Sequence, residues 1–278
     1  MVYPNSCGAD AISCDSGGTS GSSGTLQDRV SPRRGGVLIL HDLFAGDGIV
    51  NGCTLGLAVR LWGVARFLTN SHCTKTKGSV DPNYLYYQGT YGNYYDLVGR
   101  EWSDPAWFGC QWSSKCRRSD AAFIEFQTAD YQFAKIAEPT TPNTSSITVD
   151  RFSNFTVTHE WQVPMEMPVV GKRLHRVGSS TGWTYGNVSH TCQDLRDPDG
   201  SALICQYLVA TDVTSKVGDS GAPVFFIPNL APSEDPDGAG APRDVWIYGL
   251  HNGSTTEGLA VFSFWESIQV ELGDITLQ

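Results

Sequence analysis

The segment Gly-Asp-Ser-Gly-Ala-Pro-Val at residues 218–224 contains a serine that could act as a nucleophile. A serine hydroxyl attacks a carbonyl carbon efficiently only when a base removes its proton and hydrogen-bond donors stabilise the oxyanion that forms. The glycines at positions 218 and 221 free the backbone, so the amides of Gly218 and Ser220 can both point at one oxygen. Turns of this sequence also form for purely steric reasons. The segment alone therefore predicts only a candidate nucleophile, Ser220.

Two upstream segments could supply the base and its partner. His72 directly precedes Cys73 at the end of an apolar run, and Asp120 stands at the start of the apolar run 121–126. The chain order His72, Asp120, Ser220, with gaps of 48 and 100 residues, is one of the known orders of a catalytic triad. Taken singly, His72 could be a core histidine and Asp120 a capping residue. Together they predict acyl transfer, in which Ser220 attacks a peptide carbonyl, His72 accepts and returns the proton, and Asp120 orients the ring.

Short strands are the elements that must position these residues. Residues 53–60 and 64–68 predict a hairpin that delivers His72 at its end. Further strand-like runs lie at residues 121–126, 206–211, 224–227 and 245–250. Only residues 263–271 show the periodicity of a helix. The sequence therefore predicts an all-β protein with one short C-terminal helix.

Composition supports this class and argues against some partners. Charged residues make up 17% of the 278 residues, below the usual quarter, as in chains with many short strands and polar turns. A net charge of −10 and a pI near 4.9 argue against nucleic acid or an anionic membrane as a partner. No apolar run approaches the roughly 18 residues that a membrane-spanning helix needs.

Two segments look peripheral to the folded domain. Residues 1–34 are rich in Gly and Ser and predict a flexible lead-in, which leaves residues 35–278 as the main domain. Residues 228–243 contain several prolines and acidic residues and predict a surface insertion. The acidic segment 233–237 could bind calcium, but an ordinary solvated loop is the favoured interpretation, and no metal site is predicted.

The eight cysteines indicate an oxidising compartment. Their positions are Cys7, Cys14, Cys53, Cys73, Cys110, Cys116, Cys192 and Cys205. Eight cysteines allow 105 pairings, and the sequence alone does not choose among them. No Cys-x-x-Cys occurs, and only His72 and His190 lie beside a cysteine, which argues against a four-ligand zinc site. Disulfides on this scale predict a secreted or cell-surface protein.

The motifs together resemble the chymotrypsin-like serine peptidases, and among them the bacterial secreted type. The resemblance rests on Thr-Asn-Ser-His-Cys at residues 69–73, Ser-Asp-Ala-Ala at 119–122, Gly-Ser-Ser-Thr-Gly at 178–182, and the serine segment. The third stretch resembles the Gly-Arg-Thr-Thr-Gly segment of streptogrisin and α-lytic-type enzymes. Ala222 stands where most members have a second glycine, a departure that a small residue should tolerate. The resemblance covers roughly residues 35–272.

This resemblance implies a fold and a general function. Two six-stranded antiparallel β-barrels, at about residues 35–135 and 150–278, would enclose the active site in the cleft between them. Cys53–Cys73 matches the disulfide of the histidine loop in the family, which favours nearest-neighbour pairing for the other cysteines as well. The implied protein is a monomeric, secreted endopeptidase that acts on polypeptides and needs no cofactor.

The resemblance also assigns a partner to the acidic residue beside the nucleophile. A buried Asp219 needs a cation, because an uncompensated buried carboxylate is very costly. In α-lytic-type enzymes an arginine just before the Gly-x-Thr-Thr-Gly segment fills this role, and Arg176 occupies that position. We therefore expect an Arg176–Asp219 ion pair that holds the oxyanion loop. The alternative is that Arg176 lies on a solvated strand.

Substrate preference is the least determined property. Thr214 stands six residues before the serine, where trypsins place an aspartate, so Lys or Arg is not strongly attracted. The segment Tyr-Gly-Leu-His-Asn-Gly-Ser at residues 248–254 resembles the Gly-Ile-His-Trp-Gly stretch of glutamyl endopeptidases, whose histidine meets the substrate carboxylate. The predicted substrate-binding residues are Thr214, Ser215, His251, Asn252 and Gly253. An acidic preference is one interpretation; a medium-sized apolar preference, with His251 only a strand residue, is the other.

Two other functional classes are open. A chymotrypsin fold can serve as a catalytically silent binding module. The order Ser220, acidic residues, His251 also mimics an α/β-hydrolase esterase, but Ala222 breaks the required Gly-x-Ser-x-Gly, and 31 residues from nucleophile to base is very short.

Overall fold

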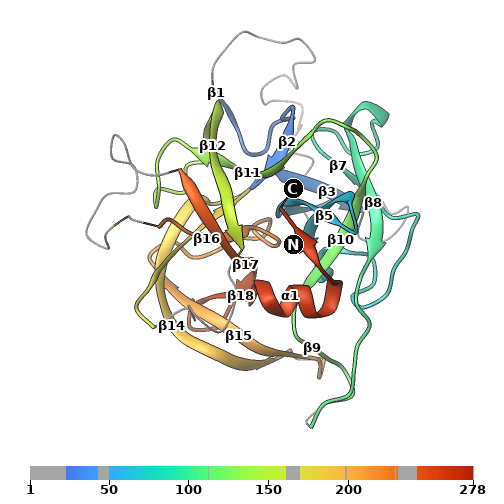
Figure 1. The fold of residues 1–278 in the computed structure, drawn as a ribbon, viewed down its shortest axis with the longest axis vertical. Helices are drawn as coiled ribbons and strands as arrows, with labels where there is room; N and C mark the ends of the chain where they lie inside the picture. Colours follow the sequence, from blue (N-terminus) through green and yellow to red (C-terminus); the bar gives the residue numbers. More distant parts are fainter. Residues whose placement is uncertain are drawn as a thin grey trace.

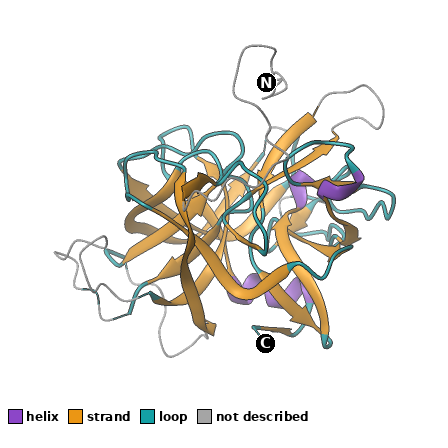
Figure 2. Cartoon of the chain, turned by 90° about the horizontal axis from the view of Figure 1, so that it is seen from above, coloured by secondary structure: helices purple, strands orange, loops and turns teal. Residues whose placement is uncertain are grey.

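The computed structural model describes residues 23–42, 50–111, 113–160, 170–197, 199–228, 230 and 243–277. They form two β-sheets and one α-helix near the C-terminus (Figure 1, Figure 2). The all-β prediction with a short C-terminal helix is confirmed. None of the helices in the described part of the chain has the length and hydropathy needed to cross a bilayer.

The first sheet contains eight strands in the order β19-β5-β6-β10-β8-β7-β3-β4. In chain order these are β3 (Leu38–Asp42), β4 (Val50–Thr54), β5 (Ala58–Leu61), β6 (Val64–Asn70), β7 (Leu85–Tyr87), β8 (Leu97–Ser103), β10 (Ala121–Phe126) and β19 (Ile275–Thr276). The number exceeds the predicted six, and the two-residue strand β19 extends the sheet at one edge. Trp62 and Gly63 both have positive φ, 51° and 79°, which is the turn geometry that matches the twist of the predicted β5–β6 hairpin.

The second sheet contains a closed barrel of six strands. These are β13 (Arg173–Gly178), β14 (Gly182–Arg196), β15 (Ala202–Thr211), β16 (Pro223–Phe226), β17 (Asp244–Ser254) and β18 (Ala260–Phe264). All six neighbouring pairs are antiparallel, and the pairing of β16 with both β13 and β17 closes the ring. The predicted six-stranded antiparallel barrel is therefore present. Five further strands extend the sheet: β1 (Ser23–Thr25), β2 (Arg33–Gly35), β9 (Cys116–Arg117), β11 (Tyr131–Pro139) and β12 (Thr148–Glu160).

Both ends of the described chain depart from the expected boundaries. Residues 23–34 fall within the predicted flexible lead-in, but β1 pairs with β12 and β2 pairs with β11. Leu26 is fully buried between these strands, and Arg33 is 2% exposed, so burial of side chains orders a segment whose composition suggested a linker. At the other end, β19 pairs with β5, so the chain returns to the first sheet after the second barrel is complete. Residues 1–22 lie outside the described residues.

One hydrophobic core joins the two sheets. Phe67 and Phe123 from the first sheet, Phe155 and Trp183 from the second, and Trp265 of the helix belong to one cluster, and all five are fully buried. The helix α1 (Trp265–Leu272) falls close to the predicted range and packs on β10, β17 and β18. Burial of large aromatic side chains from both sheets fixes the sheets relative to each other. The segments that carry the candidate site are therefore held on a common core.

Candidate active site

The antiparallel pairing of β6 with β10 brings His72 and Asp120 together. Asn70, the last residue of β6, pairs with Ala121, the first residue of β10. His72 follows β6 in the short 3-10 helix η1 (Ser71–Cys73), and Asp120 directly precedes β10, so both lie at the same end of the strand pair. His72 Nδ1 lies 2.5 Å from Asp120 Oδ2, and the His72 backbone N–H donates to Asp120 Oδ1 at 3.2 Å. The carboxylate thus contacts both the ring and the backbone of this histidine.

The Asp120 carboxylate is buried yet strongly favoured in its charged form. Its side chain is 3% exposed, whereas that of His72 is 36% exposed. Burial alone would raise the pKa of Asp120, but the charges of His72, Lys77 and Arg117 and the bond to the imidazole hold this pKa well below its usual range. An ionised Asp120 can accept a hydrogen bond from the Nδ1–H group of His72. The remaining nitrogen, Nε2, is then the one that can act as a base.

A polar layer supports Asp120 from beneath. The Asp120 backbone N–H donates to Ser263 Oγ at 2.9 Å, and Asn70 Nδ2 donates to the Asp120 carbonyl at 2.7 Å. The Asn252 amide contacts Asn70, Gln206 and Ser263 at 2.9–3.3 Å. The predicted substrate-binding residue Asn252 therefore uses its side chain in this layer.

The loop that carries Ser220 needs glycine at two positions. Gly218 and Gly221 have φ of 102° and 88°, a region that disfavours residues with a Cβ. A Cβ on Gly221 would lie 2.5 Å from the Thr54 carbonyl oxygen, and one on Gly218 would lie 2.3 Å from Ser180 Oγ. The prediction that these glycines shape the loop thus has a steric basis.

Backbone hydrogen bonds join the Ser220 loop to Thr54 of β4 and to His251 of β17. The Ser220 carbonyl accepts from the Thr54 N–H at 2.7 Å, and the Gly221 N–H donates to the His251 carbonyl at 2.9 Å. Thr54 follows Cys53, whose disulfide partner Cys73 is the neighbour of His72. The Ser220 loop is therefore hydrogen-bonded to β4, and a disulfide links β4 to Cys73, the residue next to His72. The hydrogen bonds found among the described residues do not include one between the His72 and Ser220 side chains.

The peptide between Val217 and Gly218 has a defined orientation. The Val217 carbonyl accepts from Ser180 Oγ at 2.8 Å. Because a trans peptide is planar, its N–H points opposite to its C=O, so the Gly218 N–H points away from Ser180. The Gly218 carbonyl is held in turn by Thr54 Oγ1 at 2.6 Å and Ser179 Oγ at 2.8 Å. Both peptides of the loop are therefore fixed by side-chain hydroxyls.

Asp219 is fully buried, and it has several partners in addition to the predicted Arg176. Its oxygens accept from the backbone N–H groups of Ser180, Thr181 and Lys216 at 2.9–3.0 Å, and from Thr181 Oγ1 at 2.8 Å. Arg176 Nη2 lies 3.8 Å from Asp219 Oδ2, within ion-pair range but beyond a direct hydrogen bond. The four donors satisfy the carboxylate, and Arg176 adds a neutralising charge. Arg176 is buried, at 5% exposed, rather than on a solvated strand.

The predicted pocket residues differ in how deeply they are buried and in what they contact. His251 is 1% exposed, and Arg176 Nη1 lies 3.0 Å from its Nε2 and 3.3 Å from its Nδ1. Burial, the Arg176 charge and the His72 charge together lower the pKa of His251 well below its usual range, so the ring is neutral. Thr214 is exposed, and Ser215 Oγ contacts Ser254 Oγ at 2.6 Å. Gly253 lies in β17 with extended backbone.

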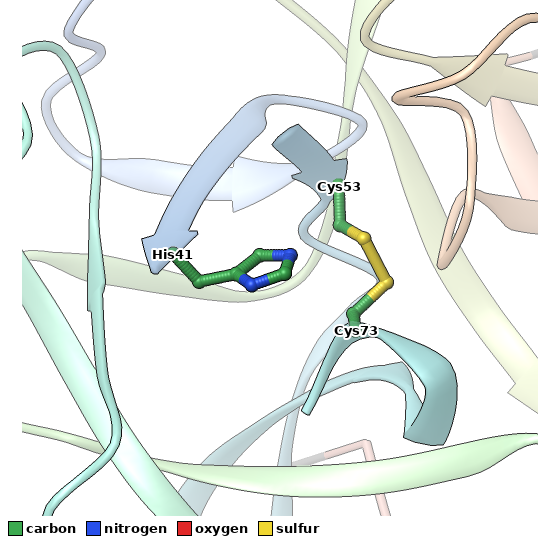
Figure 3. A group of neighbouring side chains, drawn as sticks. All are labelled: His41, Cys53 and Cys73. Atoms are coloured by element: carbon green, nitrogen blue, oxygen red, sulfur yellow. A yellow bond between two sulfur atoms is a disulfide. The ribbon is translucent and has the colours of Figure 1, made fainter. Parts of the chain in front are cut away.

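The structure contains three of the four expected disulfides: Cys53–Cys73, Cys110–Cys116 and Cys192–Cys205. Cys7–Cys14 lies outside the described residues, as does the acidic segment 233–237 considered for calcium. His41 sits against the Cys53–Cys73 bridge (Figure 3). Both sulfur atoms are used in the disulfide, and His41 Nδ1 contacts Tyr84 Oη at 2.6 Å, so this group is a packing contact and not a metal site.

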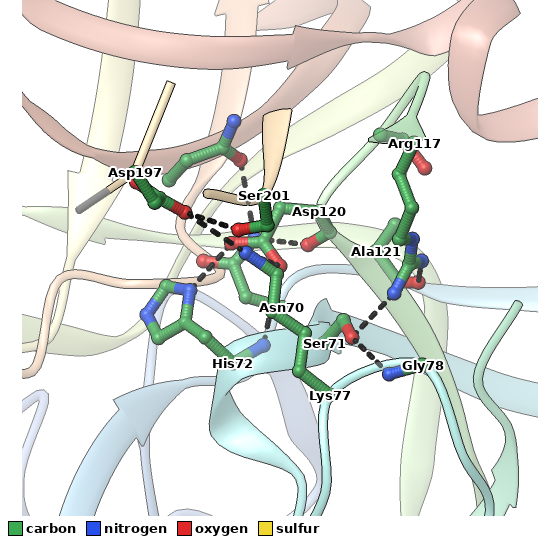
Figure 4. A network of polar contacts seen from close by, with 12 residues as sticks. Asn70, Ser71, His72, Lys77, Gly78, Arg117, Asp120, Ala121, Asp197 and Ser201 are labelled. Carbon is green, nitrogen blue, oxygen red and sulfur yellow. Dashed lines mark hydrogen bonds and ion pairs between the residues drawn. The ribbon is translucent and has the colours of Figure 1, made fainter. Parts of the chain in front are cut away.

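A buried ionic cluster behind His72 and Asp120 was not predicted. Arg117, fully buried, donates to Asp104 at 2.6 Å. It also donates to Ser71 Oγ at 2.5 Å and to the Ala121 carbonyl at 2.8 Å (Figure 4). Ser71 precedes His72 and Ala121 follows Asp120, so one guanidinium holds both segments. On the same side, Lys77 Nζ lies 3.9 Å from Asp120 Oδ1. The only available sequence signal was the presence of charged residues close to the two motifs.

Comparison with known proteins establishes the fold. No protein-family model and no curated protein matches the chain. Among solved structures, it is similar to a glutamic acid specific serine protease described as using a histidine triad in substrate binding, with 18% identity, 88% of this chain and 100% of that chain covered, and a TM-score of 0.56. It is also similar to Nocardiopsis protease (20% identity, 88% and 98% covered, TM-score 0.53) and to an α-lytic protease homologue (14% identity, 88% and 98% covered, TM-score 0.55).

The chain therefore has the chymotrypsin-like fold of bacterial serine proteases, as its motifs suggested. The neighbours are themselves serine proteases, and they align with most of this chain.

Proposed function

We propose that this protein is a serine endopeptidase with the triad His72, Asp120 and Ser220. The observation that carries the proposal is the 2.5 Å contact between His72 Nδ1 and the buried, ionised Asp120. This contact fixes the tautomer that leaves Nε2 as the base, which is the arrangement that serine nucleophiles require. The glycine-shaped loop that carries Ser220 is hydrogen-bonded to β4, the strand that a disulfide links to Cys73 beside the histidine.

In the proposed reaction, Ser220 Oγ attacks the peptide carbonyl while His72 Nε2 takes its proton. The imidazolium that forms is stabilised by Asp120 and then returns the proton to the leaving amine. An acyl-enzyme results, and water, deprotonated by His72, releases the acid and restores Ser220. The reaction needs no cofactor.

The amides of Gly218 and Ser220 are the proposed oxyanion hole. The bond from Ser180 Oγ to the Val217 carbonyl supports this role, because it turns the Gly218 N–H away from Ser180. Removal of one such donor typically costs about 10²–10³ in turnover. Ser180 lies in the Gly-Ser-Ser-Thr-Gly segment but was not predicted as a site residue, and the shape of the hole depends on it.

We further infer a preference for acidic side chains on the acyl side of the cleaved bond. Arg176 lies within 3.3 Å of both ring nitrogens of His251 and is 3.8 Å from Asp219, so a positive charge stands directly behind the imidazole. Arg176 would supply the attraction for a substrate carboxylate, while the neutral His251 ring, which already bonds the Val261 backbone, would line the pocket. The glutamic acid specific neighbour, described as using histidines in substrate binding, supports the same chemistry.

An apolar preference is the competing candidate, and the cavity beside His251 favours it. Leu174, Val209, Val224 and Phe262 line this cavity together with Arg176. Chromogenic peptides that differ only in Glu, Phe or Arg before the cleaved bond separate the two. The acidic proposal predicts the highest kcat/KM for Glu, and His251→Leu should lower that value while sparing Phe. A Phe or Arg preference would overturn it, and Ser220→Ala serves as the control for contaminating activity.

The same proposal includes the setting in which the enzyme works. Three disulfides and the fold of the neighbouring proteases support a secreted, extracellular peptidase. We expect it to be a monomer that acts on polypeptides, with no nucleic acid or membrane partner.

A further inference from the structure

We propose that Lys77 is an electrostatic positioning residue that sets the pH range of hydrolysis, and that Asp197 on the β14–β15 hairpin tunes its effect. The inference rests on the proposed function, since it concerns the same His72–Asp120 pair. It adds two residues from outside the triad, one in the turn after η1 and one in the second sheet.

Lys77 approaches the oxygen of Asp120 that does not bond the imidazole ring. Its Nζ lies 3.9 Å from Oδ1, whereas His72 Nδ1 contacts Oδ2. The carboxylate therefore has the histidine on one oxygen and the ammonium near the other (Figure 4). A charge at this distance from a buried carboxylate is weakly screened by salt or water.

Packing holds the lysine in this place. The Lys77 side chain is 22% exposed, and its ammonium lies 5.3 Å from the centre of the Trp107 ring. Trp107 Nε1 also donates to the Lys77 carbonyl at 3.0 Å, and a Cβ on Gly78 would lie 2.6 Å from that same nitrogen. One tryptophan thus fixes both the backbone and the ammonium group.

Asp197 brings a countercharge from the other sheet. Its Oδ2 lies 3.5 Å from Lys77 Nζ, and its side chain is 52% exposed. Asp197 directly follows β14, and its backbone N–H donates to the Ser201 carbonyl at 2.9 Å, so the hairpin turn holds it near the lysine. Ser201 Oγ also contacts its carboxylate at 3.3 Å. Lys77 therefore lies near two carboxylates, the buried one of Asp120 and the exposed one of Asp197.

Other charges surround the same pair. Arg117 lies behind Asp120, but it is bound to Asp104 and close to Glu271. His251 faces His72 from β17 and is backed by Arg176, which is paired with Asp219. These groups are buried in pairs of their own. Among the charged residues described around Asp120, Lys77 has the most exposed countercharge.

The sign of the effect follows from the charges. A positive Lys77 offsets the negative charge of Asp120, so Asp120 stabilises protonated His72 less. Protonated His72 is inactive as a base, and Lys77 therefore extends activity toward lower pH. Asp197 opposes this by partly neutralising Lys77. Removal of the two charges should shift the pH profile in opposite directions.

The test compares Lys77→Met, Asp197→Asn and the double variant, with Lys75→Met as a matched control. Lys75 lies two residues away and pairs with Asp81 at 2.7 Å on the surface. The acidic limb of kcat/KM should move up by on the order of 0.5 pH unit in Lys77→Met and down by a smaller amount in Asp197→Asn. The double variant should behave like Lys77→Met.

A second measurement separates this inference from the proposed function. The titration of the His72 ring, followed by NMR in a Ser220→Ala background, needs no turnover and should move in the same two directions. Shifts in this titration with no hydrolysis by the wild type would leave the electrostatic role intact and overturn the peptidase. Hydrolysis by the wild type with an unmoved limb, or with both single variants shifted alike, would overturn the role of Lys77.

Discussion

Two buried arginines stand on opposite sides of the candidate site, and they are bound in different ways. Arg117 makes direct bonds of 2.5–2.8 Å to a carboxylate, a hydroxyl and a carbonyl. Arg176 makes only looser contacts: 3.0–3.3 Å to His251 and Thr181, and 3.8 Å to Asp219. Both side chains are almost completely shielded from solvent.

The difference lies in how directly each arginine contacts its carboxylate partner. Asp219 accepts three backbone amides and one hydroxyl, and Arg176 stays 3.8 Å away. Asp104 also accepts other donors, from Ser71, Thr74 and Gly78, but Arg117 bonds it directly and ties it to Ala121 beside Asp120. Arg117 is thus a mechanical link between two segments, whereas Arg176 mainly compensates charge.

The largest effect is expected from Arg117→Met. This change leaves Asp104 buried without its cation and releases the bonds to Ser71 and Ala121. Breaking a buried ion pair from one side costs about 3–5 kcal/mol. Thermal unfolding should show a Tm lower by about 10 °C, with kcat/KM reduced because His72 and Asp120 lose their alignment. Arg100→Met, which removes an exposed pair with Glu125, is the control and should change the unfolding free energy by less than about 1 kcal/mol.

Arg176→Met should have a smaller effect on stability. Asp219 keeps four hydrogen-bond donors, so we expect a loss of about 1–3 kcal/mol in unfolding free energy. Hydrolysis should fall more for Glu substrates than for Phe substrates, because the charge behind His251 is removed. If both stability and activity were unchanged, the Arg176–Asp219 pair would have no role. A loss as large as that of Arg117→Met would contradict the comparison between the two arginines.

Glu101 offers a third case, a buried carboxylate whose backbone hydrogen bonds at Lys75 and Asp81 do not offset the effect of its burial. It is 1% exposed, and burial, with Asp104 nearby, raises its pKa to about 8. The unfolded chain releases this proton near its usual value of 4.5, so the wild type loses stability as the pH rises from about 5 to 8. The side-chain amide in Glu101→Gln does not titrate, so this variant lacks that pH-dependent loss of stability.

The unfolding free energy of Glu101→Gln relative to wild type should therefore increase by about 3–4 kcal/mol between pH 5 and pH 8. Denaturant titrations at the two pH values measure this difference directly. A constant difference across the range would mean that Glu101 is ionised in the folded protein, and that it has a partner equivalent to an arginine.

Local patterns in the sequence correctly predicted the structural elements that depend only on neighbouring residues. The turn at Trp62 and Gly63 and the helix at the C-terminus follow from turn chemistry and periodicity, and both occur. The glycines beside Ser220 were predicted to shape their loop, and they have the positive φ that this requires. These features depend on residues within a few positions of one another.

Other features depend on distances along the chain that no local pattern encodes. Asp197 is 120 residues from Lys77, and Asp104 pairs with Arg117 only because the chain folds back between them. Residues 23–34 were included in the predicted linker because they follow the Gly- and Ser-rich run at residues 17–24, although Leu26 within them is fully buried. The partners of Asp219 are mostly backbone amides, which carry no residue signature at all.

Labelling with a fluorophosphonate probe tests the central claim most directly, since the probe reacts only with an activated serine. Intact mass and peptide mapping should show one label on Ser220 in the wild type, none in Ser220→Ala, and labelling slowed by about 10³ or more in His72→Ala. A folded wild type that takes up no label, or takes it up equally in Ser220→Ala, would contradict the triad and leave the two-barrel fold as a binding module.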